Sequence, residues 1–572
     1  MTTIADWSPE YPFIDVFKTS REWITHGENI HADWNTGESD QLVLDEHGWV
    51  RFLPTSGTSP RFRSVGTLLF SKLDGNYPGG NYTVLYDGSG ELTYRLDATK
   101  NTALSTPGRD IITVTPGQTG NGIHLIITQT DPNDYIRNIR VIPPEFDPDT
   151  VDAYQFHPDF LESIASYGTL RFMDWQRTNW SVSREIIRSS TSSATMQHPL
   201  DNPEFDPNLR TGSWSQFKGW AGRSQTTDAR YSTDQGVPFE IMVDLANLNN
   251  ANAWFNVPHL AENNYVWEMA KLVHDRLQTD RYVYLEYTNE SWNTAFGQGD
   301  WIKSQGIETW GWSVDPNLAR WQWYGKRSAE ICDIWKDTWG DDADRIICVM
   351  ATHAANAYIA EEMLECPLRS FQGCYQNMDA IAIAPYFGQH LGDSQHQQAV
   401  LGWTYQADGG MNKLFAELNT GSMLTSNAIG RTNVDDAIAN IETYKLLADK
   451  YGLDLVAYEG GQHLAATGPV QNQPRILAMF EQANEDPRMG EIYSRYLEAW
   501  HDLGGTMFVH YVNTGNWGTW GTWGAQKYYN DPDSVKYPAL MSYADTCTCT
   551  WKGCTQDLGL DPKIWLPILI AP

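Results

Sequence analysis

Short runs in which apolar and polar residues alternate follow one another along the first 148 residues. Gly, Asp, Asn and Pro separate them about every ten residues, which is typical of strands joined by turns in an antiparallel unit. The runs are 66–73, 81–88, 90–97, 110–117, 122–130 and 136–142. We expect a β-sandwich here, with further strands from residues 11–53. The Pro- and Asp-rich segment 143–149 predicts the boundary between a domain at 1–148 and another at 149–572.

The pattern changes after this boundary to short apolar or β-branched runs that alternate with longer segments of helical period. The predicted strands are 169–175, 238–246, 252–258, 282–288, 345–351, 380–387, 453–459 and 506–512. Apolar residues at 266–277 and at 492–500 share one face, which predicts amphipathic helices. Eight strands with helical crossovers predict an α/β fold, a (β/α)8 TIM barrel behind the N-terminal β-sandwich domain. This count requires two strands within 238–258, and a doubly wound open sheet is the alternative.

Composition narrows the function classes. Hydrophobic residues are 41% and charged residues 19% of the chain, which excludes a disordered or fibrous protein. The net charge of −31 argues against nucleic acid or an anionic membrane as partner, because both need a cationic surface. No apolar run approaches the ~20 residues of a membrane helix. The 25 Trp and 28 Tyr indicate flat stacking surfaces in addition to core.

The seven cysteines favour disulfides over a metal site, because none forms a CxxC pair or has histidine beside it. Cys366 and Cys374 bracket a short polar segment that a disulfide could close. Cys547, Cys549 and Cys554 crowd the C-terminus, where one bridge and one free thiol are expected. This cysteine usage favours an extracellular, secreted protein, although MTTIADWSPE has no signal-peptide pattern. We expect no cofactor.

Chemistry in such a barrel lies at the carboxyl ends of its strands, which reduces the chain to a short set of candidate residues. They are Asp174 and Trp175; Asp244 and Asn247; Asn256 and His259; Asn289 and Glu290; His353 and Asn356; Tyr386; Glu459 and Gln462; and His510, Tyr511 and Asn513. Two long connections, 176–237 and 388–433, carry further Trp and Tyr and are where specificity is usually built.

Two glutamates stand out. Glu290 follows Asn289 at the end of the fourth predicted strand, and Glu459 ends the seventh. A glycosidase needs two carboxyl groups, one protonated to assist the leaving oxygen and one ionised. An Asn-Glu closing strand four and a Glu closing strand seven resemble the retaining glycoside hydrolases of clan A, over residues 150–545. The chain departs from their commonest pattern in reading Asn-Glu-Ser and Glu-Gly-Gly-Gln, so the resemblance does not place it in a named family.

The resemblance implies that Glu290 is the acid/base and Glu459 the nucleophile. Their carboxyl oxygens should then lie about 5 Å apart, and Glu290 should have the higher pKa, giving a bell-shaped pH profile. It further implies that Asn289 binds the sugar 2-hydroxyl and that Tyr386 orients the nucleophile. The substrate-binding set that we predict is Asn289, Arg171, Asp174, Trp175, His259, Tyr386, Gln462, His510, Trp517 and Trp520, with Trp523 as another possible platform.

Alternative interpretations accompany each of these residues. Glu286 is the rival of Glu290 within the same segment, and its other interpretation is a buried charge paired with Arg171. His259, His353 and His510 could form a metal triad, but no carboxylate stands at ligand spacing. Asn289-Glu290-Ser291 also matches a glycosylation sequon, which we interpret as coincidence.

These observations favour a retaining glycoside hydrolase that cleaves a polysaccharide internally. The alternatives are a non-catalytic carbohydrate-binding surface protein, a metal-dependent hydrolase and a polysaccharide lyase. The net charge favours a neutral hexose polymer over a sulfated or uronate-rich one. Basic residues in the first long loop leave the anionic polymer as the second choice: Arg177, Arg184, Arg188, Arg210, Lys218, Arg223 and Arg230. We expect the N-terminal domain to brace the barrel.

Overall fold

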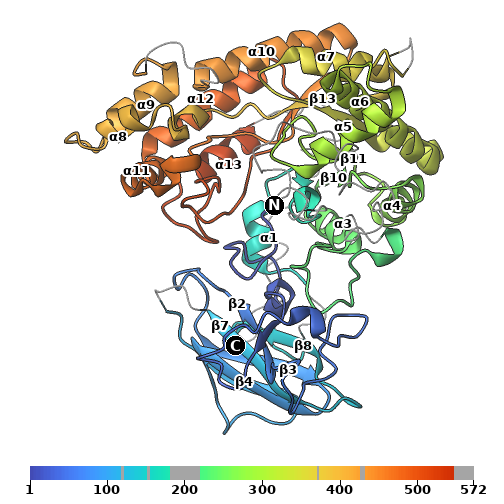
Figure 1. Ribbon diagram of the computed structural model, residues 1–572. Coiled ribbons are helices and arrows are strands. Elements are labelled where there is room, and N and C mark those ends of the chain that lie inside the picture. The colour runs from blue at the N-terminus through green and yellow to red at the C-terminus, as the bar shows by residue number, and fades with distance from the viewer. Residues whose placement is uncertain (118–121, 151–154, 181–218, 370–372, 425–431, 547–572) are drawn as a thin grey trace.

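The computed structural model describes residues 1–117, 122–150, 155–180, 219–369, 373–424 and 432–546. Two parts are visible in Figure 1: a group of antiparallel strands from the first quarter of the chain, and a larger part in which helices surround a parallel sheet. The described part of the chain contains no helix that is long and apolar enough to cross a membrane.

The N-terminal part contains two four-stranded antiparallel sheets. One has the strand order β1-β2-β7-β4 and the other β5-β6-β3-β8. The strands are β1 (Ile24–His26), β2 (Ser64–Leu69), β3 (Gly80–Asp87), β4 (Gly90–Leu96), β5 (Ala98–Lys100), β6 (Arg109–Val114), β7 (Ile123–Thr130) and β8 (Arg137–Ile142). Alternate side chains of β6, such as Ile112 and Val114, are buried, and they join side chains of β3 and β7 in one apolar cluster. The period of two in the sequence therefore places one face of each sheet in a shared core.

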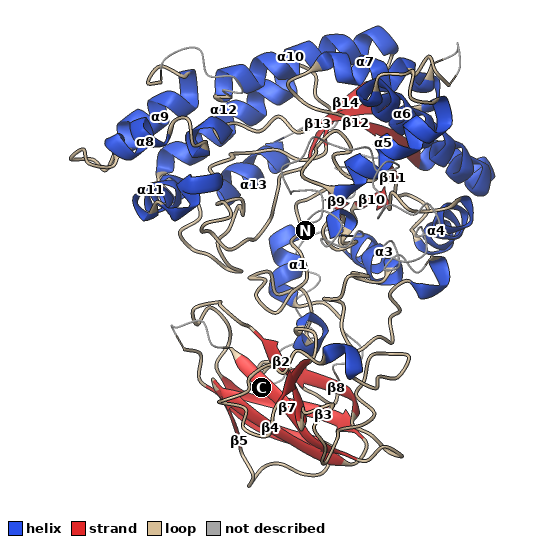
Figure 2. Cartoon of the chain, viewed as in Figure 1, coloured by secondary structure: helices blue, strands red, loops and turns tan. Residues whose placement is uncertain are grey.

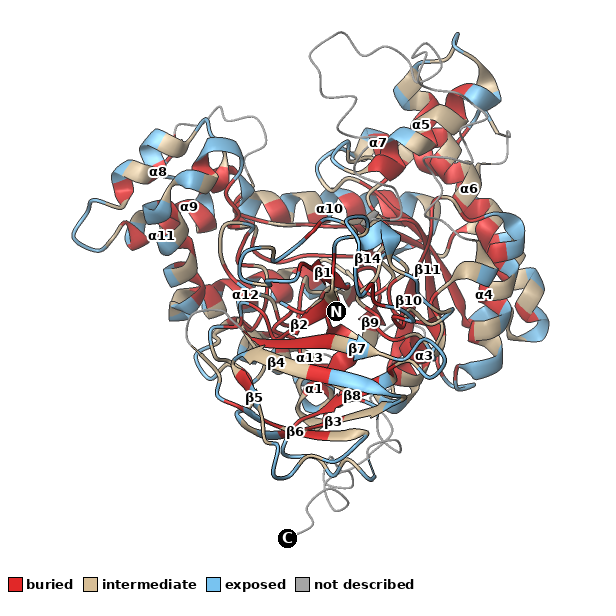
Figure 3. Ribbon diagram, turned by 60° about the horizontal axis from the view of Figure 1, so that its bottom comes forward, coloured by how far each residue is buried: buried red, intermediate tan, exposed pale blue. Residues whose placement is uncertain are grey.

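A seven-stranded parallel sheet forms the centre of the larger part, with its strands side by side in chain order. The strands are β9 (Thr169–Arg171), β10 (Asn252–Val257), β11 (Val283–Tyr287), β12 (Ile346–Ala351), β13 (Ala380–Ile383), β14 (Asp454–Ala457) and β15 (Met507–Phe508). Each neighbouring pair is parallel, so every connection is a crossover, as the sequence predicts. The sheet is curled, and its strands are largely buried in Figure 3.

The helices of this part cover the outside of the sheet (Figure 2). They are α1 (Pro158–Ile164), α3 (Phe239–Leu248), α4 (Asn263–Arg276), α5 (Gly297–Trp310), α6 (Pro316–Trp339), α7 (Ala357–Glu365), α8 (Gln397–Trp403), α9 (Met411–Thr420), α10 (Val434–Tyr451), α11 (Pro474–Glu485), α12 (Pro487–Asp502) and α13 (Lys536–Thr546). Helices α4 and α12 confirm the two amphipathic predictions. The longest of the described helices is α6. Asp315 caps its N-terminus, because the Asp315 carboxylate accepts hydrogen bonds from the backbone amides of Asn317 and Leu318.

The predicted strand 238–246 is wrong, because these residues form α3. The run PFEIMVDLANL has polar residues at Glu240, Asp244 and Asn247, and their spacings of four and three residues follow a helical period that the strand interpretation overlooked. Met242, Leu245 and Ala246 are fully buried at helical spacing, and the helix supplies the crossover from β9 to β10. The parallel sheet thus has seven strands in the described residues rather than eight.

β9 and β15 are the two edge strands of this sheet, and the beginning of the chain contacts the segment after β15. The hydroxyl of Thr2 donates to the carbonyl of Thr514, and the side chain of Asn516 donates to the carbonyl of Trp7 at 2.7 Å. Phe13 is buried against Phe156, and its ring also contacts Trp175 and Tyr231. The first residues of the chain therefore pack against the larger part near the segment that follows β15.

The two parts also meet through the segment 228–231, which precedes α3. The amide of Tyr231 donates to the carbonyl of Lys18 at 2.8 Å, and the Lys18 ammonium donates to the carbonyl of Asp228 at 2.6 Å. The guanidinium of Arg230 lies 4.4 Å from the ring centre of Trp23. Backbone pairing and a buried cation–π contact thus join the sheets to the barrel-like part.

Phe13→Ala should lower the free energy of unfolding by about 3–5 kcal/mol, because it removes a buried aromatic ring from this junction. Denaturant unfolding followed by tryptophan fluorescence measures the change. Leu104→Ala is the control, since Leu104 is 58% exposed. Equal stability of both variants would contradict the described packing.

Candidate active site

Polar side chains from four strands converge at one end of the parallel sheet. Arg171 is the last residue of β9, and Asn289 and Glu290 follow β11. Tyr386 follows β13, and Glu459 lies two residues past β14. Because the carboxyl ends of parallel strands lie at one edge, residues far apart in the sequence meet here.

The guanidinium of Arg171 connects this group. Its Nη1 donates to Glu459 at 2.8 Å, and its Nη2 donates to Glu286 and to the Asn289 side-chain oxygen, both at 2.8 Å. The Arg171 side chain is only 3% exposed. Burial disfavours its charge, but the two carboxylates outweigh this effect and raise the pKa of Arg171 above its usual value.

Glu286 lies within β11 and is completely buried. Besides the two bonds from Arg171, its Oε2 accepts a hydrogen bond from the indole of Trp254 at 2.9 Å. Burial raises the pKa of Glu286 despite the lowering effect of Arg171. This geometry confirms the interpretation of Glu286 as a buried charge paired with Arg171.

Glu290 has a different environment. Its two carboxyl oxygens accept hydrogen bonds from the hydroxyl of Tyr458 at 3.2 Å and from the side-chain amide of Asn293 at 2.8 Å. Burial, and then the negative charge of Glu459, raise its pKa to about 7. Glu290 is therefore a carboxyl group that holds its proton near neutral pH.

The chain carries Glu290 into the site through an unusual backbone. Thr288 and Glu290 have φ angles of 53° and 43°, in the left-handed region that residues with a side chain rarely adopt. The side chain of Asn256 donates to the carbonyl of Thr288 at 2.6 Å, and Gln298 donates to the carbonyl of Asn289 at 2.9 Å. Buried amides thus compensate the strain of this turn.

Glu459 is held on both of its oxygens. Oε1 accepts from Arg171, and Oε2 accepts from the hydroxyl of Tyr386 at 3.0 Å. The two glycines after it allow close packing, since a Cβ on Gly460 would lie 2.4 Å from the Phe508 ring and one on Gly461 would lie 2.7 Å from the Tyr493 hydroxyl. A charged donor and a neutral donor therefore fix the Glu459 carboxylate.

Asp174 adds a fourth carboxyl group, after Glu286, Glu290 and Glu459, to this end of the sheet. Burial, reinforced by the charge of Glu459, raises its pKa to about 6, and the hydroxyl of Tyr511 lies 3.4 Å from its Oδ2. The predicted position of Asp174 in the site agrees with these contacts.

An aromatic wall stands beside Glu459. The ring of Trp523 contacts those of Tyr386, His463 and Tyr511, with ring centres 5.5, 4.3 and 5.8 Å away. Trp520 is 80% exposed nearby in the chain. Trp517, by contrast, is nearly buried, and the ammonium of Lys536 lies 4.9 Å from its ring, so it is not an open platform as predicted.

Trp175 does not line the site. The strand that we predicted to end at Trp175 ends at Arg171, and the following turn directs this indole into the core. It is fully buried against Phe13, Phe160 and Phe172. Its assignment to substrate binding is therefore corrected.

Three other predicted residues are buried beside the site. Burial lowers the pKa of His259 to about 3, and its carbonyl accepts from the hydroxyl of Tyr287. Tyr493 links the other two, since its hydroxyl accepts from the amide of Gln462 at 3.0 Å and lies 3.1 Å from the Nε2 of His510. Burial lowers the pKa of His510 to about 3 as well. The contacts of Tyr493 with Gln462 and His510 therefore hold the segment after β14 in place, and His259 packs beside β11.

The sequence interpretation missed several contacts of the site. Trp254 and Tyr458 resemble ordinary core aromatics, because both stand in or beside apolar strands. The alternation of side chains along each strand is the signal that could have found them. Trp254 pairs with Tyr284 in register, and both belong to the same buried cluster as Tyr458. Asn179 and Gln298, which contact Asn289, carry no such signal.

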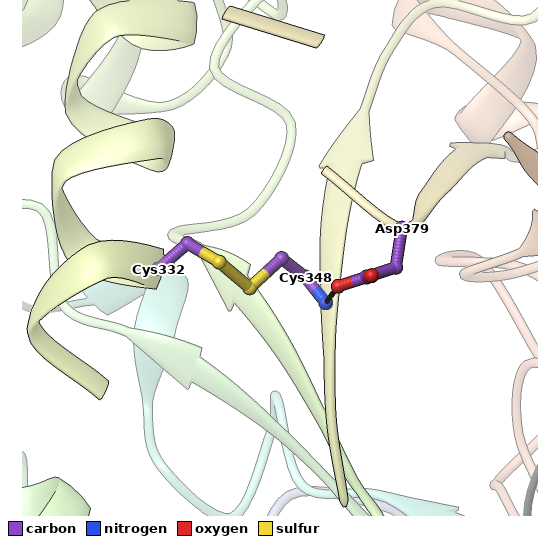
Figure 4. Close-up of side chains that lie close together, drawn as sticks. All are labelled: Cys332, Cys348 and Asp379. Atoms are coloured by element: carbon purple, nitrogen blue, oxygen red, sulfur yellow. Dashed lines mark hydrogen bonds between the residues drawn. A yellow bond between two sulfur atoms is a disulfide. The ribbon is translucent and has the colours of Figure 1, made fainter. Parts of the chain in front are cut away.

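One group of described residues brings three potential metal-binding atoms together, and it lies away from this site. Cys332, Cys348 and Asp379 are shown in Figure 4, where the two sulfurs form a disulfide. Asp379 accepts from the amide of Cys348 and from Lys336, both at 2.9 Å. The sulfurs are thus used in the bridge. A second disulfide confirms the predicted pairing of Cys366 with Cys374, while Cys547, Cys549 and Cys554 lie outside the described residues.

Comparisons with known proteins add little to this geometry. No protein-family profile matches the chain, and no curated protein is similar to it in sequence. A structural likeness is found to an endo-β-1,4-mannanase double mutant from Cellulomonas fimi, at 10% identity, covering 56% of this chain and 59% of that one, with a TM-score of 0.28. A Bacteroidetes-affiliated GH5 cellulase gives 9% identity, 68% and 94% coverage and a TM-score of 0.30. A GH5-4 endoglucanase from Bacteroides salanitronis is similar at 12% identity, covering 53% of this chain and 74% of that one, with a TM-score of 0.29.

Glu459→Gln should lower the pKa of Glu290 from about 7 toward its usual value, because the substitution removes the nearby negative charge while burial remains. The carboxyl resonance of Glu290 in a ¹³C-Glu-labelled protein, assigned with Glu290→Gln, reports the titration. Glu442→Gln, at an exposed position on α10, is the control and should leave the pKa unchanged. An unaltered pKa in Glu459→Gln would show that the two carboxyls do not interact.

Proposed function

We propose that this protein is a retaining glycoside hydrolase that cleaves a polysaccharide internally. The observation that carries the proposal is the pair of carboxyl groups in one buried site with opposite environments. Glu459 accepts from a guanidinium and a phenol, whereas the pKa of Glu290 is raised to about 7 by burial and by Glu459. A carboxylate held by a cation and a phenol, and a carboxyl group of raised pKa, suit the nucleophile and the acid/base of the double-displacement mechanism.

In the proposed mechanism Glu459 attacks the anomeric carbon, and the bond from that carbon to the leaving oxygen breaks. Glu290 gives its proton to the leaving oxygen and becomes a carboxylate. Water then attacks the glycosyl–Glu459 ester, Glu290 takes a proton from that water, and the sugar leaves with its original anomeric configuration. Each carboxyl group returns to its starting state. The spacing of about 5 Å between the two carboxyls remains a prediction of this mechanism.

The strand positions support the same proposal once the open edge is counted. If the place between β15 and β9 is position one of eight, β9 occupies position two, and β11 and β14 occupy positions four and seven. Glu290 and Glu459 then follow the positions on which the resemblance to clan A rests. The loss of the strand at 238–246 therefore leaves the relative placement of the two residues unchanged.

Charge supports a neutral substrate. The cation within the described network, Arg171, already donates to two carboxylates. Of the basic residues in the first long loop, Arg177 pairs with Asp234, Arg223 pairs with Glu240, and Arg230 packs on Trp23; Arg184, Arg188, Arg210 and Lys218 lie outside the described residues. A neutral β-linked glucan, mannan or related hexose polymer fits this balance, and the exposed ring of Trp520 fits stacking on a sugar.

The N-terminal part, whose two sheets we take as a β-sandwich, is assigned a bracing role in this proposal. Its contacts with the segment 228–231 fix the chain that leads into α3. We place the working protein outside the cell, in keeping with the two disulfides among the described residues.

Glu459→Ala and Glu290→Ala should both lose hydrolysis of the natural polymer by at least about 10³-fold, because each removes one chemical role. Azide should restore turnover of an activated aryl glycoside in both variants, but with different stereochemistry. With Glu459→Ala azide attacks directly and gives the α-azide, whereas with Glu290→Ala it attacks the glycosyl-enzyme and gives the β-azide. Proton NMR of the products distinguishes the two anomers.

Glu442→Ala is the matched control, at an exposed position on α10, and should hydrolyse as the wild type does. Full activity of Glu459→Ala, or the same azide anomer from both active-site variants, would contradict the assigned roles. A wild type that binds polymers without cleaving them would instead favour a carbohydrate-binding protein.

In a panel of neutral and sulfated polysaccharides, a neutral β-linked polymer should be cleaved. The reason is that Arg171, the cation of the described site, is already paired with Glu286 and Glu459 and is not available to an anionic sugar. Products sized by chromatography should be oligosaccharides from internal cleavage. Hydrolysis confined to sulfated or uronate-rich polymers would contradict the charge argument, and release of single sugars alone would contradict internal cleavage.

A further inference from the structure

Asn289 is held by contacts on both ends of its side-chain amide. Its oxygen accepts from Arg171 at 2.8 Å, and its nitrogen donates to the Oδ1 of Asn179 at 3.1 Å. Turning the amide over would place two oxygens opposite each other at Asn179 and two donors opposite each other at Arg171. The orientation of Asn289 is therefore fixed, and the nitrogen retains a second N–H.

Asn179 is itself held in place by Gln298. The Nε2 of Gln298 donates to the Oδ1 of Asn179 at 2.7 Å and to the backbone carbonyl of Asn289 at 2.9 Å, so both of its N–H groups are used. Gln298 is 1% exposed and lies in the first turn of α5. Asn179 belongs to the turn Thr178–Trp180 that follows β9, and its own nitrogen lies 3.6 Å from the sulfur of Met173.

The three amides thus connect the chain after β9, the turn after β11 and the start of α5. They meet at the residue that precedes Glu290, in the turn where Thr288 and Glu290 have positive φ angles. Asn289 and Gln298 are buried and Asn179 is half-buried, and the hydrogen bonds that join the three amides favour one arrangement of them. The bonds from Asn289 to Asn179 and from Gln298 to Asn179 therefore hold the second N–H of the Asn289 side chain in one direction.

We infer that Asn179 and Gln298 are positioning residues that hold the Asn289 amide for the substrate hydroxyl next to the anomeric carbon. This inference rests on the proposed function. The contact with that hydroxyl strengthens in the transition state, so its loss is expressed in kcat/KM. Asn179 acts as an acceptor of two donors, and Gln298 acts as a donor to two acceptors.

The test compares Gln298→Leu, Asn179→Leu and Asn179→Asp with the wild type on 2,4-dinitrophenyl β-glycosides of glucose-, mannose- and galactose-based disaccharides and on their 2-deoxy analogues. This leaving group needs no acid, so a small displacement of Glu290 does not obscure the result. Gln298→Leu and Asn179→Leu should lose about 10- to 100-fold in kcat/KM with the 2-hydroxy probe. With the 2-deoxy probe they should stay within about threefold of the wild type, because the contact is absent.

Asn179→Asp keeps an acceptor oxygen in the position of Oδ1 with almost no change in volume, so it should retain most of the activity toward the 2-hydroxy probe. Thermal unfolding of each variant checks that it is folded. Equal losses on both probes, or an Asn179→Asp as impaired as Asn179→Leu, would overturn the inference while leaving the proposed function intact. A wild type that leaves every probe intact would overturn the proposed function and the inference with it.

Discussion

The site depends on one buried guanidinium. Arg171 donates to Glu286 in β11, to Asn289 in the turn after β11, and to Glu459 after β14. Charges taken out of water are stable only when they are paired and hydrogen-bonded, so this set forms together or not at all. The parallel sheet makes that possible, because it brings the ends of β9, β11 and β14 to one edge.

The balance around Arg171 gives the three glutamates different properties. Glu286 pairs with the guanidinium of Arg171, and the indole of Trp254 donates a further hydrogen bond to the Glu286 carboxylate. Glu459 shares the cation and has Tyr386 as a second donor. Glu290 is left to neutral donors, Tyr458 and Asn293, and burial together with Glu459 raises its pKa to about 7. Identical side chains thus acquire different hydrogen-bond partners and different charges beside them from the surrounding structure.

Much of this arrangement could be predicted from the sequence, because strand ends are marked by a change from apolar to polar residues. Seven of the strands, Glu290, Glu459 and the pairing of Glu286 with Arg171 follow from that pattern. The helix α3 was missed because its apolar residues were interpreted as a strand, although Glu240, Asp244 and Asn247 follow a helical period. Trp175 was misplaced because the strand ends four residues earlier than the apolar run does. Asn179 and Gln298 are long-range amide contacts, which leave no period or motif in the sequence.

Trapping of the covalent intermediate tests the central claim most directly. A 2,4-dinitrophenyl 2-deoxy-2-fluoro-glycoside of the sugar that the protein cleaves slows both steps but still forms the ester, so the glycosyl-enzyme accumulates. The account predicts that the intact mass rises by one fluoroglycosyl group, that peptide mapping places this group on Glu459, and that Glu459→Gln is not labelled. A label on another residue, or turnover with inversion and no label, would contradict the account.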